Sequence, residues 1–180
     1  MTSAVDLTEH LQRLFAMSIE AKIAAADSLP EHILAAGAKL SECLLNNGKL
    51  FICGNAGSAA NAEHFSTAML HHHEVERPPL PVISMTHDMP LATALQQDNQ
   101  QEYVFSRSLQ ALGMEEDVLI LLTTSGQTTN LVHAVDAAHD RGMDVVVLCG
   151  IDKGMLANHL GPNDLTIDVP GENVARIREM

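Results

Sequence analysis

Residues 49–70 read KLFICGNAGSAANAEHFSTAML, and the character of the chain changes halfway along this stretch. Lys49–Cys53 is a short, mainly apolar run, which predicts a buried strand. The loop GNAGS follows, and Ser58–Leu70 is expected to form a helix. A strand that passes through a tight, glycine-containing loop into a helix is typical of a parallel α/β sheet. This stretch therefore decides the expected fold class.

The alternation of strand and helix continues through the rest of the chain. Four more apolar runs predict strands, at Leu80–Met85, Asp117–Leu122, Asp144–Cys149 and Leu165–Val169. Helices are expected between them, over Met89–Leu112 with an interruption and over Thr129–Arg141. Strands that are apolar throughout and joined by helices form parallel sheets covered on both faces. We therefore predict an α/β fold with a doubly wound, five-stranded parallel sheet flanked by helices.

Two helices are predicted ahead of the first strand, over Asp6–Asp27 and Glu31–Leu45, and Pro30 separates them. Both have apolar side chains at helical spacing. These apolar stripes can pack on the same domain or on another subunit, and the sequence leaves both alternatives open. We expect a single domain over residues 1–180, with N-terminal helices over 1–47 and the α/β sandwich over 48–180.

The composition limits the partners of this chain. It has 23 Asp and Glu residues against 10 Lys and Arg, a formal net charge of −13, which disfavours direct binding to nucleic acids. No apolar stretch approaches the ~20 residues that span a bilayer, so no membrane partner is expected. The three cysteines are scattered and two of them lie in predicted strands. This pattern favours buried free thiols in a reducing, cytoplasmic compartment.

Two loops have the composition of a phosphate site. Gly54–Ser58 links the first strand to its helix, and Thr123–Thr129 links the third strand to its helix. Glycine lets the backbone approach a ligand, and the free amides of a helix N-terminus favour an anion. If the strand order is 2-1-3-4-5, both loops lie at the topological switch point and face one crevice. The alternative is that the hydroxyl side chains only cap their helices.

Nearly the whole chain resembles the SIS-domain family of phosphosugar-binding proteins, through the motifs CGNAGSAANAEHF, ERPPLPVIS, TTSGQTTNLVHAVDAAHDRGM, GPNDLTIDVP and ARIREM. The resemblance is to the branch that contains the phosphoheptose isomerases and the DnaA initiator-associating protein. It implies a homotetramer with a pocket shared between subunits, and a C-terminal helix that we expect to be cut short at Met180. It also implies phosphate contacts from Ser58, Thr123, Thr124, Ser125 and Thr128, and sugar-side contacts from Asn55 and Asp98.

The resemblance also shows where this chain departs from the isomerases. In those enzymes one helix carries a His and, four residues later, a Glu, and the two side chains share a helix face; here the positions are His64 and Ala68. Arg178 stands where the isomerases have a Gln ligand. Alanine can neither accept a proton nor bind a metal. We therefore expect no catalytic residue, metal or cofactor, and we retain His64 and zinc only for the case that the chain is an isomerase.

These departures favour a non-catalytic adaptor that keeps the phosphosugar pocket, binds DnaA and promotes replication initiation. The alternative is sedoheptulose 7-phosphate isomerase, an enzyme of lipopolysaccharide heptose synthesis. This enzyme would need another base, such as Glu63, His87 or Glu102. A third hypothesis is a sensor that binds a phosphosugar and reports it to a partner protein.

Overall fold

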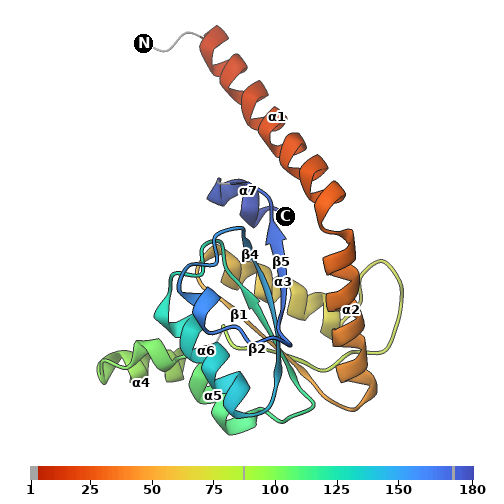
Figure 1. Cartoon of the computed structure of the whole chain (residues 1–180). Helices are drawn as coiled ribbons and strands as arrows, with labels where there is room; N and C mark the ends of the chain where they lie inside the picture. The colour runs from red at the N-terminus through yellow and green to blue at the C-terminus, as the bar shows by residue number, and fades with distance from the viewer. Residues whose placement is uncertain (1–3, 87, 172) are drawn as a thin grey trace.

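The computed structural model of the chain describes residues 4–86, 88–171 and 173–180, and it contains one parallel sheet (Figure 1). The five strands lie in the order β2-β1-β3-β4-β5, and every neighbouring pair is parallel. Their bounds are β1 Leu50–Gly54, β2 Val82–Ser84, β3 Val118–Leu122, β4 Asp144–Gly150 and β5 Leu165–Val169. The predicted fold class is confirmed, and the strand order is the one under which the two predicted loops would face one crevice.

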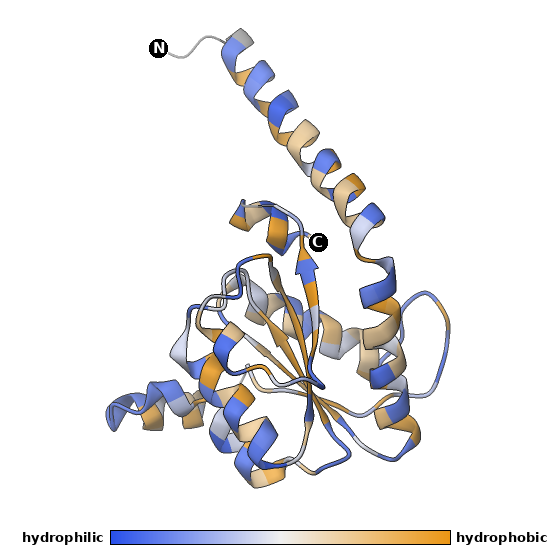
Figure 2. Cartoon of the chain, in the orientation of Figure 1, coloured by the Kyte–Doolittle hydropathy of each residue, from blue (hydrophilic) through white to orange (hydrophobic). Residues whose placement is uncertain are grey.

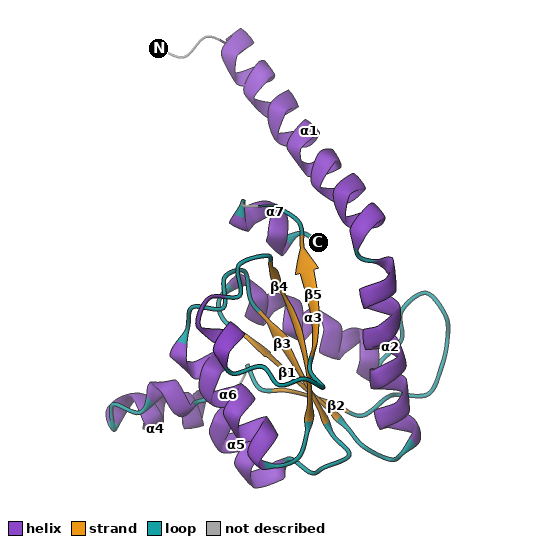
Figure 3. Cartoon of the chain, in the orientation of Figure 1, coloured by secondary structure: helices purple, strands orange, loops and turns teal. Residues whose placement is uncertain are grey.

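Helices cover both faces of this sheet (Figure 3). The α-helices are α1 Ala4–Ser28, α2 Pro30–Leu45, α3 Gly57–Leu70, α4 Met89–Gln97, α5 Ser106–Leu112, α6 Thr129–Asp140 and α7 Val174–Arg178. Two 3-10 turns are added, η1 Gln101–Tyr103 and η2 Gly154–Asn158. The region predicted as an interrupted helix is broken into α4, η1 and α5, as expected. The turn η2 was not predicted from the sequence.

Alternate residues of each central strand point to opposite faces of the sheet and enter two separate cores. Phe51 and Cys53 belong to the core that α5 and α6 cover, whereas Leu50 and Ile52 belong to the core under α2 and α3. These four side chains are fully buried. Because both faces of β1 are packed against helices, its two ends are the only places where a ligand can meet this strand.

Helix α1 extends away from the sheet, and only the region near its end reaches the core, where Ala25 is buried (Figures 1 and 2). The helix carries an apolar stripe at four-residue spacing, and in this single chain each member is more than half exposed. The members are Leu7, Leu11, Phe15, Ile19 and Ile23. Own-domain packing therefore does not account for this stripe.

The described part of the chain contains three cysteines, and all three are buried free thiols, as expected. Burial and the neighbouring Asp168 carboxylate raise the pKa of the Cys149 thiol to about 12. A buried thiol with a raised pKa is a poor nucleophile, because the thiolate is the reactive form. None of the described helices has the length and apolar character that crossing a membrane requires.

Candidate functional site

The two predicted loops meet at the carboxyl ends of β1 and β3, which are neighbours in the sheet. The Asn55 amide nitrogen donates to Thr128 Oγ1 at 3.1 Å and to Asn130 Oδ1 at 2.9 Å. Asn130 returns the contact, since its amide nitrogen donates to Asn55 Oδ1 at 2.9 Å. This reciprocal amide pair fastens one loop to the other. We call Asn55, Thr128 and Asn130 the inter-loop cradle.

The first loop turns tightly because it passes close to the next strand. A Cβ on Gly54 would lie 2.8 Å from both the Leu122 carbonyl oxygen and Ser58 Cβ, so only glycine fits there. Ala56 has a positive φ of 52°, and α3 begins at the next residue. Ser58 is buried in the first turn of α3. The loop therefore presents Asn55 to the crevice while Ser58 lies deeper.

The second loop does not bring all of its predicted phosphate contacts to one place. The Thr123 hydroxyl accepts from the backbone amide of Gly126 at 3.1 Å, which orders the loop itself. Thr124 and Ser125 line a hollow of about 440 Å³ beside α7, whereas Thr128 lines a different and larger cavity. Only Thr128 of this group joins Asn55 in the inter-loop cradle.

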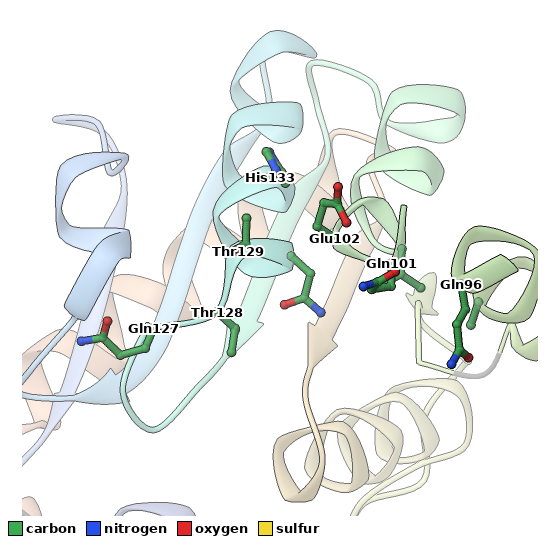
Figure 4. A pocket seen from close by; sticks show the side chains of 10 residues that line it. Gln96, Gln101, Glu102, Gln127, Thr128, Thr129 and His133 are labelled. Carbon is green, nitrogen blue, oxygen red and sulfur yellow. The ribbon is translucent and has the colours of Figure 1, made fainter. Parts of the chain in front are cut away.

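The larger cavity has a volume of about 770 Å³ and opens between α4, η1 and the start of α6 (Figure 4). Its wall includes Thr128 and Asn130 of the cradle, and also two ionisable side chains, Glu102 and His133. Asp98, the predicted sugar-side contact, lies at the end of α4, is exposed, and does not line this cavity. The cavity therefore offers a different carboxylate from the one expected.

The His133 imidazole is held by stacking against the Tyr103 ring, with ring centres 4.7 Å apart and planes inclined by 33°. Within residues 4–86, 88–171 and 173–180, neither Glu102 nor His133 makes a side-chain hydrogen bond or ion pair. Sequence reasoning named Glu102 as a substitute base but missed His133 and Asn130. The signal for both was their place in the first two turns of the helix after the second loop.

The face of α3 that carries His64 has no second acid–base side chain at position 68. His64 is exposed, and Ala68 occupies the next turn. Glu63 is directed elsewhere, because its Oε1 accepts from Ser84 Oγ at 2.8 Å and from the Thr86 hydroxyl. Glu63 is therefore engaged with Ser84 at the end of β2 and with Thr86 two residues later. The other proposed substitute, His87, lies outside the described residues.

Arg178 lies against the start of α3. A Cβ on Gly57 would come within 2.6 Å of Cδ and Nε of Arg178, and the Arg178 carbonyl accepts from the Asn61 amide at 3.1 Å. A guanidinium here repels a metal cation, and Ala68 supplies no ligand atom. Among the described residues no group of three His, Cys, Asp or Glu side chains is arranged to hold a metal. The described residues around His64 therefore do not fit zinc.

A doubly wound sheet with a hydroxyl- and amide-bearing cradle at its switch point is the architecture of a ligand-binding α/β domain. The chain belongs to the SIS domain family, which it matches over residues 15–150. It is 41% identical to a phosphoheptose isomerase from Shewanella loihica, over 97% of this chain and 88% of the relative.

Two solved structures have the same fold over nearly their whole length. The phosphoheptose isomerase GmhA from Neisseria gonorrhoeae superimposes with a TM-score of 0.88 at 40% identity, over 96% of this chain and 92% of that one. A phosphoheptose isomerase from Francisella tularensis gives a TM-score of 0.92 at 40% identity, over 96% and 90% of the two chains.

The interpretation of the chain as a non-catalytic adaptor for DnaA is therefore wrong. Relatives about 40% identical over nearly the full length are named phosphoheptose isomerases, which supports the alternative hypothesis of an isomerase. The error came from the weight given to Ala68 and Arg178. Ala68 on α3 lacks the carboxylate of an acid–base pair and Arg178 lies on α7, but neither residue lines the cavity that contains the Glu102 carboxylate and the His133 imidazole.

Proposed function

We propose that the chain is an isomerase of phosphorylated sugars, and that its substrate is sedoheptulose 7-phosphate. The observation that carries the proposal is the inter-loop cradle, which places amide and hydroxyl groups at the switch point and on the wall of a 770 Å³ cavity. Hydrogen-bond donors in such a crevice suit a phosphate and sugar hydroxyls. The relatives are named phosphoheptose isomerases, which supports a phosphorylated seven-carbon sugar as the substrate.

The reaction interconverts a ketose phosphate and an aldose phosphate. A proton leaves the carbon on one side of the carbonyl and returns to the former carbonyl carbon, while a second proton moves between the two oxygens. The enzyme must supply a base for the carbon-bound proton and a donor for the oxygen. The cavity beside the cradle contains one carboxylate and one imidazole, which are side chains of the required types.

Turnover of sedoheptulose 7-phosphate by the full chain tests the proposal directly. We expect a measurable rate for the wild type, and an approximately tenfold higher KM for Asn130→Ala, because this variant loses the reciprocal bonds to Asn55. Asn158→Ala, at an exposed position at the end of η2, is the matched control and should leave KM unchanged. A folded wild type with no rate above the blank would show that the function is wrong.

We also propose that the chains assemble as a homotetramer through α1. The support is the exposed apolar stripe of that helix, since soluble proteins rarely leave such a row of large side chains uncovered. Phe15 is the most exposed member, at 71%.

Light scattering should therefore give four times the chain mass for the wild type, and a smaller mass for Phe15→Glu combined with Ile19→Glu. Replacing the exposed, charged Glu20 by Gln is the control on the same helix. A monomeric wild type would contradict the assembly.

A further inference from the structure

The cavity beside the inter-loop cradle has two ionisable side chains on its wall, Glu102 and His133. Glu102 comes from η1 and His133 from α6, and both are half-buried on the wall (Figure 4). Two other ionisable side chains of this region are engaged with neighbouring groups. Glu63 is bonded to Ser84 and Thr86, and Lys153 is paired with Asp168 at 2.6 Å.

The two side chains are placed to act on a ligand that the cradle anchors. Asn130 and His133 are three residues apart on α6, and side chains at this spacing are neighbours on one helix face. Asn130 and Thr128 line the same cavity as Glu102 and His133. A sugar phosphate anchored at the cradle would therefore extend its carbon chain along the wall that these two groups form.

The immediate surroundings leave both groups able to exchange protons. Apart from one another, the cavity wall presents them only with neutral groups, namely amide and hydroxyl side chains and the apolar Ala92 and Val104. The Tyr103 ring contacts the His133 ring. Partial burial limits the water that reaches a bound carbon acid, which favours return of the proton to the sugar rather than its loss to solvent.

We infer that Glu102 and His133 are the proton-transfer pair of this enzyme, in place of a pair on α3; the inference rests on the proposed isomerase function. The Glu102 carboxylate removes the proton from C1 of the open-chain ketose. The C–H electron pair forms a C1=C2 double bond, and the C2 oxygen takes a proton from the His133 imidazolium.

The resulting enediol then returns to a sugar by the same two groups. Protonated Glu102 delivers its proton to C2, while neutral His133 accepts the proton of the C1 hydroxyl as the C1 aldehyde forms. Both side chains end in the state in which they began, and no oxidant, reductant or metal takes part. The sum of the steps is the conversion of ketose to aldose.

Kinetics of Glu102→Gln and His133→Asn, measured on the full chain with sedoheptulose 7-phosphate, test the pair. Each is expected to lower kcat by about 10²–10⁴-fold while KM changes by less than about threefold, because the cradle that binds the substrate is untouched. Glu42→Gln and His32→Asn, both exposed on α2, are the matched controls and should keep the wild-type kcat. Melting curves confirm that each variant is folded.

A graded variant and an isotope measurement make the outcomes separable. Glu102→Asp keeps a carboxylate on a side chain that is one methylene shorter, so this variant should have an intermediate kcat. It should still exchange the C1 proton with deuterated solvent, whereas Glu102→Gln should show no such exchange. If the wild type is active and the Glu102→Gln and His133→Asn variants keep the wild-type kcat, the proton-transfer pair is wrong but the isomerase function is retained. An inactive wild type would overturn both.

Discussion

Replacing Asp117 by alanine is expected to lower the free energy of unfolding by about 3 kcal/mol. The carboxylate is only 2% exposed and accepts three hydrogen bonds, from the Lys49 ammonium at 2.6 Å, the Lys49 backbone amide at 2.9 Å and the Met114 backbone amide at 2.8 Å. Alanine leaves all three donors without this acceptor. The estimate is at the lower end for a broken buried pair, since the Lys49 side chain remains 26% exposed.

Urea denaturation monitored by circular dichroism measures this loss. Asp144→Ala is the matched control, because it removes a carboxylate that pairs with Lys39 at 2.5 Å but is 44% exposed, so its loss should be below about 1 kcal/mol. If both variants lose the same free energy of unfolding, burial of the Asp117 carboxylate does not account for its contribution to stability. Asp117 lies at the amino ends of β1 and β3, away from the cradle, so the folded Asp117→Ala protein should keep the wild-type KM for the proposed substrate.

Gly126→Ala is expected to be the most damaging single change in the second loop. A Cβ there would lie 1.9 Å from the Lys153 carbonyl oxygen, and φ is +60°, which non-glycine residues rarely adopt. The loop and η2 must separate for the methyl group to fit. We expect a loss of about 3 kcal/mol in unfolding free energy, and at least about a tenfold rise in KM as Thr128 shifts away from Asn55.

Glycine-to-alanine substitution at Gly37 is expected to change the free energy of unfolding in the opposite direction. Gly37 lies inside α2, is exposed, and a Cβ there meets no atom within 4 Å. Gly37→Ala should therefore raise the free energy of unfolding by about 0.5–1 kcal/mol and leave KM unchanged. Thermal melting of the two variants beside the wild type, together with KM values, provides the comparison. A Gly126→Ala protein as stable as Gly37→Ala would show that the loop and η2 are not tightly packed.

The fold could be predicted from the sequence because each strand is marked by its own continuous apolar run. The runs DVLILL and DVVVLC are apolar at successive positions, so neither face of these strands can be exposed, and a parallel sheet covered on both sides is expected. The two glycine-containing loops then indicate its switch point. The region over Met89–Leu112 carried no equally regular signal, yet its interruption was predicted correctly.

The site was predicted only in part, because side-chain contacts between distant segments leave no pattern in sequence. Asn55 and Thr128 were named, but the Asn130 amide that pairs with Asn55 was missed. His133 was also missed, since a lone histidine on an amphipathic helix has no distinguishing periodicity. The contact of Arg178 with Gly57 depends on how α7 packs on α3, which local sequence does not specify.

The inter-loop cradle also ties ligand binding to folding. Asn55 and Asn130 are 75 residues apart in sequence, so they meet only after β1 and β3 have paired, and the cradle does not exist in the unfolded chain. A ligand held there binds the native state alone and stabilises it by mass action, by about 2.7 kcal/mol at a hundredfold excess over Kd. A ligand of the cradle should thereby lower the fraction of molecules that are unfolded and open to proteolysis.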